Sequence, residues 1–118
     1  MVHNPGVIPS DNRLFTGADV IVVFENGFAN YTQNSMDQKL SDLTIQSPNG
    51  YSRQNFAYMF NGVPSNWSDG DFRGFLNNVK GGAGMLFVSD RSLRDRENIY
   101  GGFGGDWGQF IDSLASLN

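Results

Sequence analysis

The sequence of 118 residues contains no cysteine, which excludes disulfides, thiol catalysis and cysteine-based zinc sites. It has one histidine, His3, and no Gly-x-Ser-x-Gly motif, so neither a serine-hydrolase triad nor a histidine metal site is predicted. Eight Lys and Arg against twelve Asp and Glu give a net charge of −4, which argues against a nucleic-acid partner. No apolar run approaches the roughly 20 residues of a membrane span. The sequence therefore predicts one globular unit with no cofactor, no metal, no nucleic acid and no membrane partner.

Three apolar runs predict buried strands, namely Asp19–Glu25, Phe56–Phe60 and Gly84–Asp90. The first has five consecutive apolar residues without alternation, which is typical of a strand buried on both faces in a parallel sheet. The runs recur about every thirty residues, the length of a strand with its crossover helix. The chain also begins abruptly, with what reads as the end of a strand before the Asn4-Pro5-Gly6 turn. We expect the sequence to start inside a larger fold.

The segments between these runs predict helices. One covers Ser35–Leu43 with Ser35 as its N-cap, and one covers Phe72–Val79, capped by Ser68 or Asp69 and ended by two glycines. Asp106 opens a last helix, whose apolar side holds Trp107, Phe110, Ile111 and Leu114. A short helical turn is expected near residues 13–15. Strands that alternate with helices predict an α/β fold with a parallel sheet.

Polar residues end each predicted strand: Asn4, Glu25, Asn61 and Asp90. In parallel α/β folds, reactive groups lie at these carboxyl ends. Glu25 follows a very apolar strand, where an unpaired carboxylate is costly to bury. It either caps a helix and holds a loop, or it serves catalysis or sugar binding.

Two carboxylates at one end of a barrel suit glycoside hydrolysis, in which one acts as acid and the other as base or nucleophile. Asp90 is the second candidate, although an ion-paired loop with Arg91, Arg94 and Arg96 would also explain it. Tyr31 and Trp107 are candidates for stacking on a sugar, with core packing as the alternative. Two sequons make Asn30 and Asn66 candidate glycosylation sites.

Taken together, several motifs resemble the carboxyl-terminal half of the spherulin 4 (spherulation-specific family 4) proteins. These are Asn4-Pro5-Gly6, the segment Ala18–Glu25 with Asn30-Tyr31 shortly after it, Gly84–Asp90 and Asp106-Trp107. The resemblance covers essentially the whole chain. It implies a (β/α)8 barrel and, as in glycoside hydrolase family 135, hydrolysis of N-acetylgalactosamine-containing polysaccharide of cell walls and biofilms. Glu25 matches the family's functional glutamate, whereas the family's acidic pair on an earlier strand has no counterpart here.

We therefore interpret residues 1–118 as a single unit, a partial TIM barrel of about four strands that forms the carboxyl-terminal half of a glycoside hydrolase domain. In this interpretation Glu25 and Asp90 are catalytic, while Asn4, Tyr31, Asn61 and Trp107 bind substrate. The unit is expected to be inactive alone and to associate with itself or with a complementary amino-terminal half. The resemblance implies a secreted or cell-surface location. The alternatives are a non-catalytic carbohydrate-binding or cell-surface module, and a structural fragment without ligand affinity.

Overall fold

A computed structural model of the chain describes residues 1–9, 19–46, 51–92, 101–102 and 104–117. The short helical turn expected near residues 13–15 lies outside these ranges. Four parallel strands form one sheet in the order β1-β2-β3-β4. They are β1 (Val2–His3), β2 (Val20–Gly27), β3 (Phe56–Asn61) and β4 (Met85–Val88). The predicted α/β fold with a parallel sheet is confirmed.

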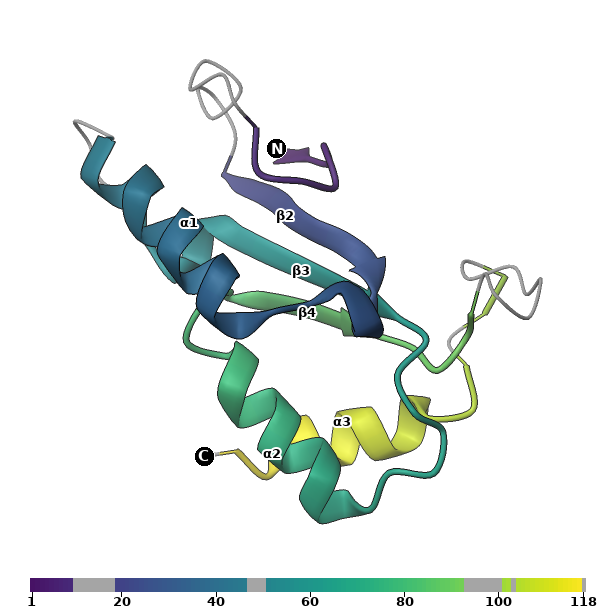
Figure 1. The fold of residues 1–118 in the computed structure, drawn as a ribbon. Coiled ribbons are helices and arrows are strands. Elements are labelled where there is room, and N and C mark those ends of the chain that lie inside the picture. The colour runs from purple at the N-terminus through teal and green to yellow at the C-terminus, as the bar shows by residue number, and fades with distance from the viewer. Residues whose placement is uncertain (10–18, 47–50, 93–100, 103, 118) are drawn as a thin grey trace.

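The helices follow the strands along the chain, and Figure 1 shows their arrangement around the sheet. They are α1 (Gln33–Gln46), α2 (Asp69–Val79) and α3 (Trp107–Ala115), with short 3-10 turns η2 (Phe28–Asn30) and η3 (Arg53–Asn55) before α1 and β3. One large apolar core joins strand residues to buried residues of all three helices, among them Met36 of α1, Phe72 of α2 and Phe110 of α3. The described helices thus share one side of the sheet.

The capping predictions were right for α2 and wrong for α1. Ser68 is the N-cap of α2, where its hydroxyl accepts a hydrogen bond from the Asp71 N–H (3.1 Å) and the Asp71 carboxylate accepts one from the Ser68 N–H (3.1 Å). Helix α1 begins at Gln33, two residues before the expected cap Ser35, which lies in its first turn. The Met36 N–H already donates to the Thr32 carbonyl (3.1 Å), so backbone bonding starts the helix earlier than the apolar spacing indicated.

The apolar side predicted for α3 is only partly buried. Phe110 is buried among core residues, whereas Ile111 and Leu114 are 42% and 39% exposed. Helix α3 packs chiefly against α2. Ile111 and Leu114 therefore lie on its solvent side, whereas Trp107 packs against the core.

Strand β2 contains an irregularity that decides which way its side chains point. Its register with β3 shifts between Val22 and Phe24, so that Val23 is an extra residue of the kind found in a β-bulge. Val23 and Phe24 both join the large core on the helix side. Val20 and Val22 form a second, smaller cluster with Ala57 on the other face of the sheet, against which Met59 packs.

Apolar side chains of the edge strands remain exposed. Val2 in β1 is 60% exposed and Met85 in β4 is 51% exposed. Each is paired in register with a residue of the smaller cluster, Val2 with Val20 and Met85 with Ala57, so both lie on that second face. The second face is the side of the sheet that the interior of a closed barrel would occupy.

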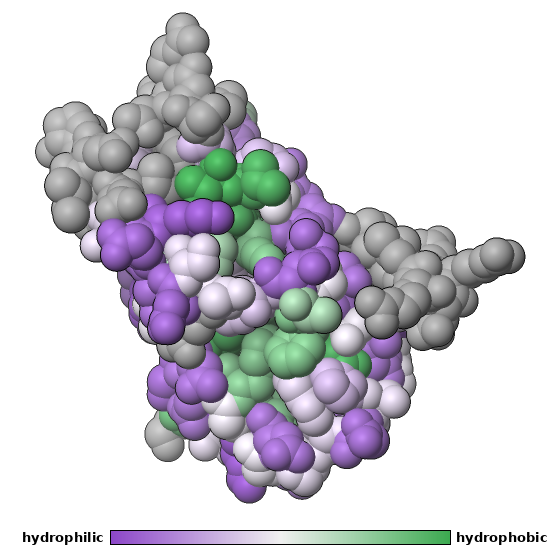
Figure 2. Space-filling view, in the orientation of Figure 1, coloured by the Kyte–Doolittle hydropathy of each residue, from purple (hydrophilic) through white to green (hydrophobic). Residues whose placement is uncertain are grey.

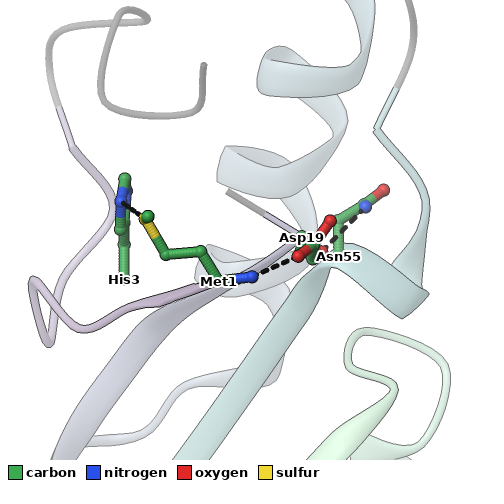
Figure 3. A network of polar contacts seen from close by, with 4 residues as sticks. All are labelled: Met1, His3, Asp19 and Asn55. Atoms are coloured by element: carbon green, nitrogen blue, oxygen red, sulfur yellow. Dashed lines mark hydrogen bonds and ion pairs between the residues drawn. The ribbon is translucent and has the colours of Figure 1, made fainter. Parts of the chain in front are cut away.

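Polar contacts tie the amino-terminal ends of the strands together (Figure 3). The amino group of Met1 pairs with the Asp19 carboxylate, and the Met1 carbonyl accepts from the Asp19 N–H (2.9 Å). Asn55 Nδ2 donates to the Asp19 carbonyl (3.2 Å), and a ring nitrogen of His3 lies 3.0 Å from the Met1 sulfur. These contacts align β1, β2 and the entry to β3 at the end of the sheet opposite the predicted site.

Candidate functional site

The predicted site residues from the strand ends all lie along the carboxyl edge of the sheet. Glu25 is near the end of β2, Asn61 is the last residue of β3, and Asp90 follows β4 by two residues. Glu25 is paired in register with Met59, which packs against the smaller cluster, so Glu25 faces the second side of the sheet. Glu25 and Asp90 are both partly buried.

Asn4 and Glu25 meet at the turn that follows β1. Gly6 in this turn has φ +70°. A Cβ on Gly6 would lie 3.5 Å from both Cβ and Oε2 of Glu25. The same position is 4.0 Å from Asn4 Oδ1. The Gly6 carbonyl also accepts a hydrogen bond from the Glu25 N–H (2.9 Å). The turn therefore holds an amide and a carboxylate side by side at the carboxyl edge.

A cavity of about 460 Å³ opens between the ends of β2, β3 and β4. This volume is within the range of small-molecule sites. Its polar lining includes Asn61 and Asp90, two of the predicted residues. Four more side chains there can bond hydroxyl groups: Asn26, Asn30, Ser65 and Ser92. Asn26 Oδ1 accepts from the Gly27 N–H (2.7 Å) and from Asn30 Nδ2 (2.9 Å), which fixes the rim of the cavity.

The glycine-rich segment before α3 folds against Asp90. The Gly105 N–H donates to Asp90 Oδ1 (2.9 Å). Gly104 has φ +84°, and a Cβ there would lie 2.5 Å from Asp90 Oδ1, 2.8 Å from Ser89 Oγ and 3.1 Å from Asp106 Oδ1. Only glycine fits so close an approach in this backbone conformation. The alternative explanation for Asp90 was an ion-paired loop, and two of the arginines it needs, Arg94 and Arg96, lie outside the described residues.

Asp106 lies beside Asp90 and is not among the site residues predicted from the sequence. It was predicted only to open the last helix, and it does stand at the N-cap of α3, but its side chain makes no capping hydrogen bond. The residue is 5% exposed, and neither carboxyl oxygen has a hydrogen-bond partner among the described residues. Burial raises the pKa of Asp106 to about 6, and the nearby charge of Asp90 also raises it. A buried carboxyl with a strongly raised pKa is a recognised signal of a functional site.

Neither aromatic candidate is among the residues that line the cavity at the carboxyl edge, although Trp107 directly follows Asp106. Tyr31 sits on the helix side, where its ring packs edge-on against Phe24 (5.4 Å between centroids) and Phe60 (5.1 Å). Burial, followed by the charge of Asp37, raises the pKa of Tyr31 to about 12. Trp107 packs against Phe87 and Phe110 at the start of α3 and is partly buried. Their stacking on a sugar stays a prediction.

A second aromatic surface lies on the helix side. Phe28, Tyr31, Trp67 and Phe75 line a shallow cavity there, and Figure 2 shows apolar surface near the centre of this face. Trp67 packs edge-on against Phe28 with 5.1 Å between centroids. These rings extend the core outward and lie away from Glu25 and Asn4.

The remaining sequence predictions concern glycosylation, metal binding and membrane insertion. Asn30 and Asn66 are both exposed, so their glycosylation stays a prediction. In the described ranges no three His, Asp or Glu residues gather in a way that could hold a metal ion. Among those same residues, no helix is long and apolar enough to cross a bilayer.

A parallel sheet with helices on one side and polar groups along its carboxyl edge defines a segment of an α/β barrel. Residues 1–114 match the model of the spherulation-specific family 4, and the chain belongs to this family. Among solved structures, the crystal structure of Aspergillus clavatus Sph3 in complex with GalNAc matches with 32% sequence identity and a TM-score of 0.72. The match covers 98% of this chain and 42% of the Sph3 chain. No curated protein matches.

These comparisons confirm the family resemblance and the fold class predicted from the motifs. The four parallel strands with their helices form an open sheet, a partial (β/α)8 barrel. The chain spans less than half the length of the Sph3 chain that it matches.

Proposed function

We propose that the chain is the carboxyl-terminal half of a glycoside hydrolase-like barrel that acts on galactosamine-containing polysaccharide. The observation that carries this proposal is the similarity, along 98% of the chain, to a structure solved with GalNAc. The carboxyl edge supports it, because Asn4, Glu25, Asn61 and Asp90 all stand where barrel enzymes keep their reactive groups.

In this proposal Glu25 is the acid, the base or the carboxylate that orients the substrate. It is partly buried, and both its Oε2 and Asn4 Oδ1 lie within 4.0 Å of the position that a Cβ of Gly6 would take, so the two side chains line the same turn. Asp90 is the second carboxylate, and Asn61 lines the same cavity as Asp90. A pair of carboxylates flanking the glycosidic bond is the usual requirement for hydrolysis.

The test measures binding and hydrolysis separately. Isothermal titration with GalNAc reports binding, and the release of reducing ends from a galactosamine-containing polysaccharide reports hydrolysis. In the barrel completed by the amino-terminal half, Glu25→Gln keeps the shape of the side chain, so hydrolysis should fall by at least about 100-fold while GalNAc binding changes little. Asp112→Asn, an exposed change on α3, is the matched control. Full turnover in Glu25→Gln would refute the role of Glu25.

The second candidate is a non-catalytic carbohydrate-binding or cell-surface module. Glu25 does not line the cavity that holds Asn61 and Asp90, which favours this candidate, since hydrolysis needs two carboxylates that flank one glycosidic bond. GalNAc binding by the 118-residue chain without any hydrolysis, unaffected by Glu25→Gln and by any added complementary half, would select this candidate. Either function places the protein where polysaccharide is found, so we propose that it is secreted or attached to the cell surface.

We also propose that a second copy or a complementary half covers the second face of the sheet. Val2 and Met85 expose apolar side chains there, on the two edge strands. Unpaired edges and exposed apolar surface both favour association. Light scattering should show a species larger than 13.0 kDa, and Met85→Lys should reduce its size. A monodisperse monomer at all concentrations would exclude a second copy, and a mixture with the complementary half that forms no complex would exclude that half.

A further inference from the structure

Asp106 is buried in surroundings that disfavour its charge: burial and the charge of Asp90 raise its pKa, although the backbone groups of Asp90 and of Asp106 itself act in the opposite direction. It is 5% exposed, and neither carboxyl oxygen has a hydrogen-bond partner in the described part of the chain. An ionised carboxylate in such a place costs several kcal/mol unless it is paired or protonated. The N-terminus of α3 favours a negative charge at this position, but no N–H group of the helix donates a capping hydrogen bond to the Asp106 side chain.

The group that faces Asp106 most directly is a second carboxyl. Asp106 Oδ1, Asp90 Oδ1 and Ser89 Oγ all surround the position that a Cβ of Gly104 would take. Asp90 is the one described titratable side chain that acts electrostatically on Asp106. Within the described ranges, the cation next to Asp90 in the sequence is Arg91, whose guanidinium lies against Gly102, 2.9 Å from the position of a Cβ there. The Ser89 hydroxyl is the remaining polar group at this spot, and it accepts a hydrogen bond from the Arg91 N–H (3.1 Å).

We propose that Asp106 shares a proton with Asp90 and thereby positions the Asp90 carboxylate toward the cavity at the carboxyl edge. The protonated Asp106 hydroxyl donates to one Asp90 oxygen, while the Gly105 N–H holds Asp90 Oδ1. Asp90 is then a fixed acceptor for a hydroxyl of a sugar in the cavity that it lines. Asp106 is a positioning residue, because it is buried behind Asp90 and does not line this cavity itself. This inference rests on the proposed carbohydrate function.

The shared proton makes the arrangement dependent on pH. The pKa of Asp106, about 6 because of burial and of the Asp90 charge, keeps it protonated in mildly acidic solution. When the proton leaves, two negative carboxylates face each other, and Asp90 loses the hydrogen bond from the Asp106 hydroxyl while it keeps the one from the Gly105 N–H. Sugar binding through Asp90 is therefore expected to be strongest below pH 6 and to weaken as the pH rises.

The experiment has two independent readouts on the full 118-residue chain. The first is the carboxyl 13C chemical shift of Asp106 followed by NMR between pH 3 and pH 8, without any ligand. It should titrate near pH 6 in the wild type and at lower pH in Asp90→Asn. Titration of Asp106 below about pH 4.5 in the wild type would overturn the proposal, whatever the chain binds.

The second readout is the affinity for GalNAc, measured at pH 5 and at pH 7.5. If the sugar binds better when Asp106 is protonated, binding raises the Asp106 pKa. A rise of half to one unit corresponds to an affinity that is about threefold to tenfold lower at pH 7.5 than at pH 5. In Asp106→Asn the amide donates to Asp90 at every pH, so affinity should stay near the acidic wild-type value and lose its pH dependence. Asp106→Leu, which has no donor, should bind weakly at both pH values, and Asp112→Asn should behave as the wild type.

The outcomes distinguish a failure of the proposed carbohydrate function from a failure of the positioning role of Asp106. If GalNAc does not bind at any pH but Asp106 titrates near pH 6, the proposed function fails and the shared proton stands. If GalNAc binds with the same affinity at both pH values, or if Asp106→Asn keeps the wild-type pH dependence, the positioning role of Asp106 is refuted and the proposed function stands.

Discussion

The substitution Asp106→Asn should stabilise the protein at neutral pH and leave its stability unchanged in acid. Burial raises the pKa of this carboxyl from 3.8 to about 6 in the folded state. A carboxyl with a raised folded pKa binds more protons in the folded than in the unfolded state between these two values. Stability is therefore lost as the pH rises from about 4 to about 6, and the full penalty remains at higher pH.

The size of the effect follows from the shift. A shift of about two units corresponds to about 3 kcal/mol, at 1.36 kcal/mol per unit. Asp90, which lies beside Asp106, is partly exposed, so solvent screens part of this penalty. We expect Asp106→Asn to raise the free energy of unfolding by about 1–2 kcal/mol at pH 7.5 and to change it by less than about 0.5 kcal/mol at pH 4.

Urea denaturation followed by circular dichroism at both pH values measures this difference directly. The exposed Asp112→Asn on the same helix removes the same charge and should shift stability little at either pH. The reasoning is refuted if Asp106→Asn destabilises the protein at pH 7.5. It is refuted equally if the gain at pH 4 is as large as the gain at pH 7.5, because a charge penalty must disappear on protonation.

Two further predictions concern the backbone and the helix cap. Gly104→Ala should cost about 2 kcal/mol or more of stability, because φ is +84° and the new Cβ would lie 2.5 Å from Asp90 Oδ1; Gly108→Ala in α3, where the Cβ meets nothing within 4 Å, should instead be neutral or stabilise by about 0.5 kcal/mol. Equal effects of the two changes in thermal unfolding would contradict the packing at Gly104. Ser68→Ala should cost about 1 kcal/mol by removing the N-cap of α2, and Ser68→Asn should recover most of the loss; no change in either variant would show that the cap contributes nothing.

The order of strands and helices was predictable because each element carries a local signal. The apolar runs of β2, β3 and β4 predicted their positions to within one or two residues, and Ser68, one of the two predicted caps, is the N-cap of α2, which begins at Asp69 rather than at Phe72. The start of α1 was harder, because Gln33 has no capping signal of its own and the apolar spacing begins only at Met36. Such a boundary depends on backbone hydrogen bonding, which leaves little trace in the sequence.

The candidate site was predictable at strand ends and not beyond them. Glu25, Asn61 and Asp90 each follow an apolar run, so the topology of a parallel sheet places them at one edge. Asp106 follows no strand and stands before a helix, where an aspartate is ordinarily a cap. Its proximity to Asp90 depends on how the glycine-rich segment folds, with Gly104 at positive φ, and no local pattern in the sequence encodes that approach.

The bulge in β2 shows how one unpaired residue directs the chemistry of the site. In a regular strand side chains alternate, so Glu25 would share the helix-covered face of Ile21 and Val23, where its charge would be buried in the large core. The register shift between Val22 and Phe24 inserts one extra residue, and Glu25 then pairs with Met59 on the opposite face. The same shift turns Phe24 into the large core, where it packs against Tyr31 and thus pulls that aromatic to the helix side. One backbone irregularity therefore places Glu25 on the second face of the sheet and Phe24, with Tyr31 packed on it, on the helix side.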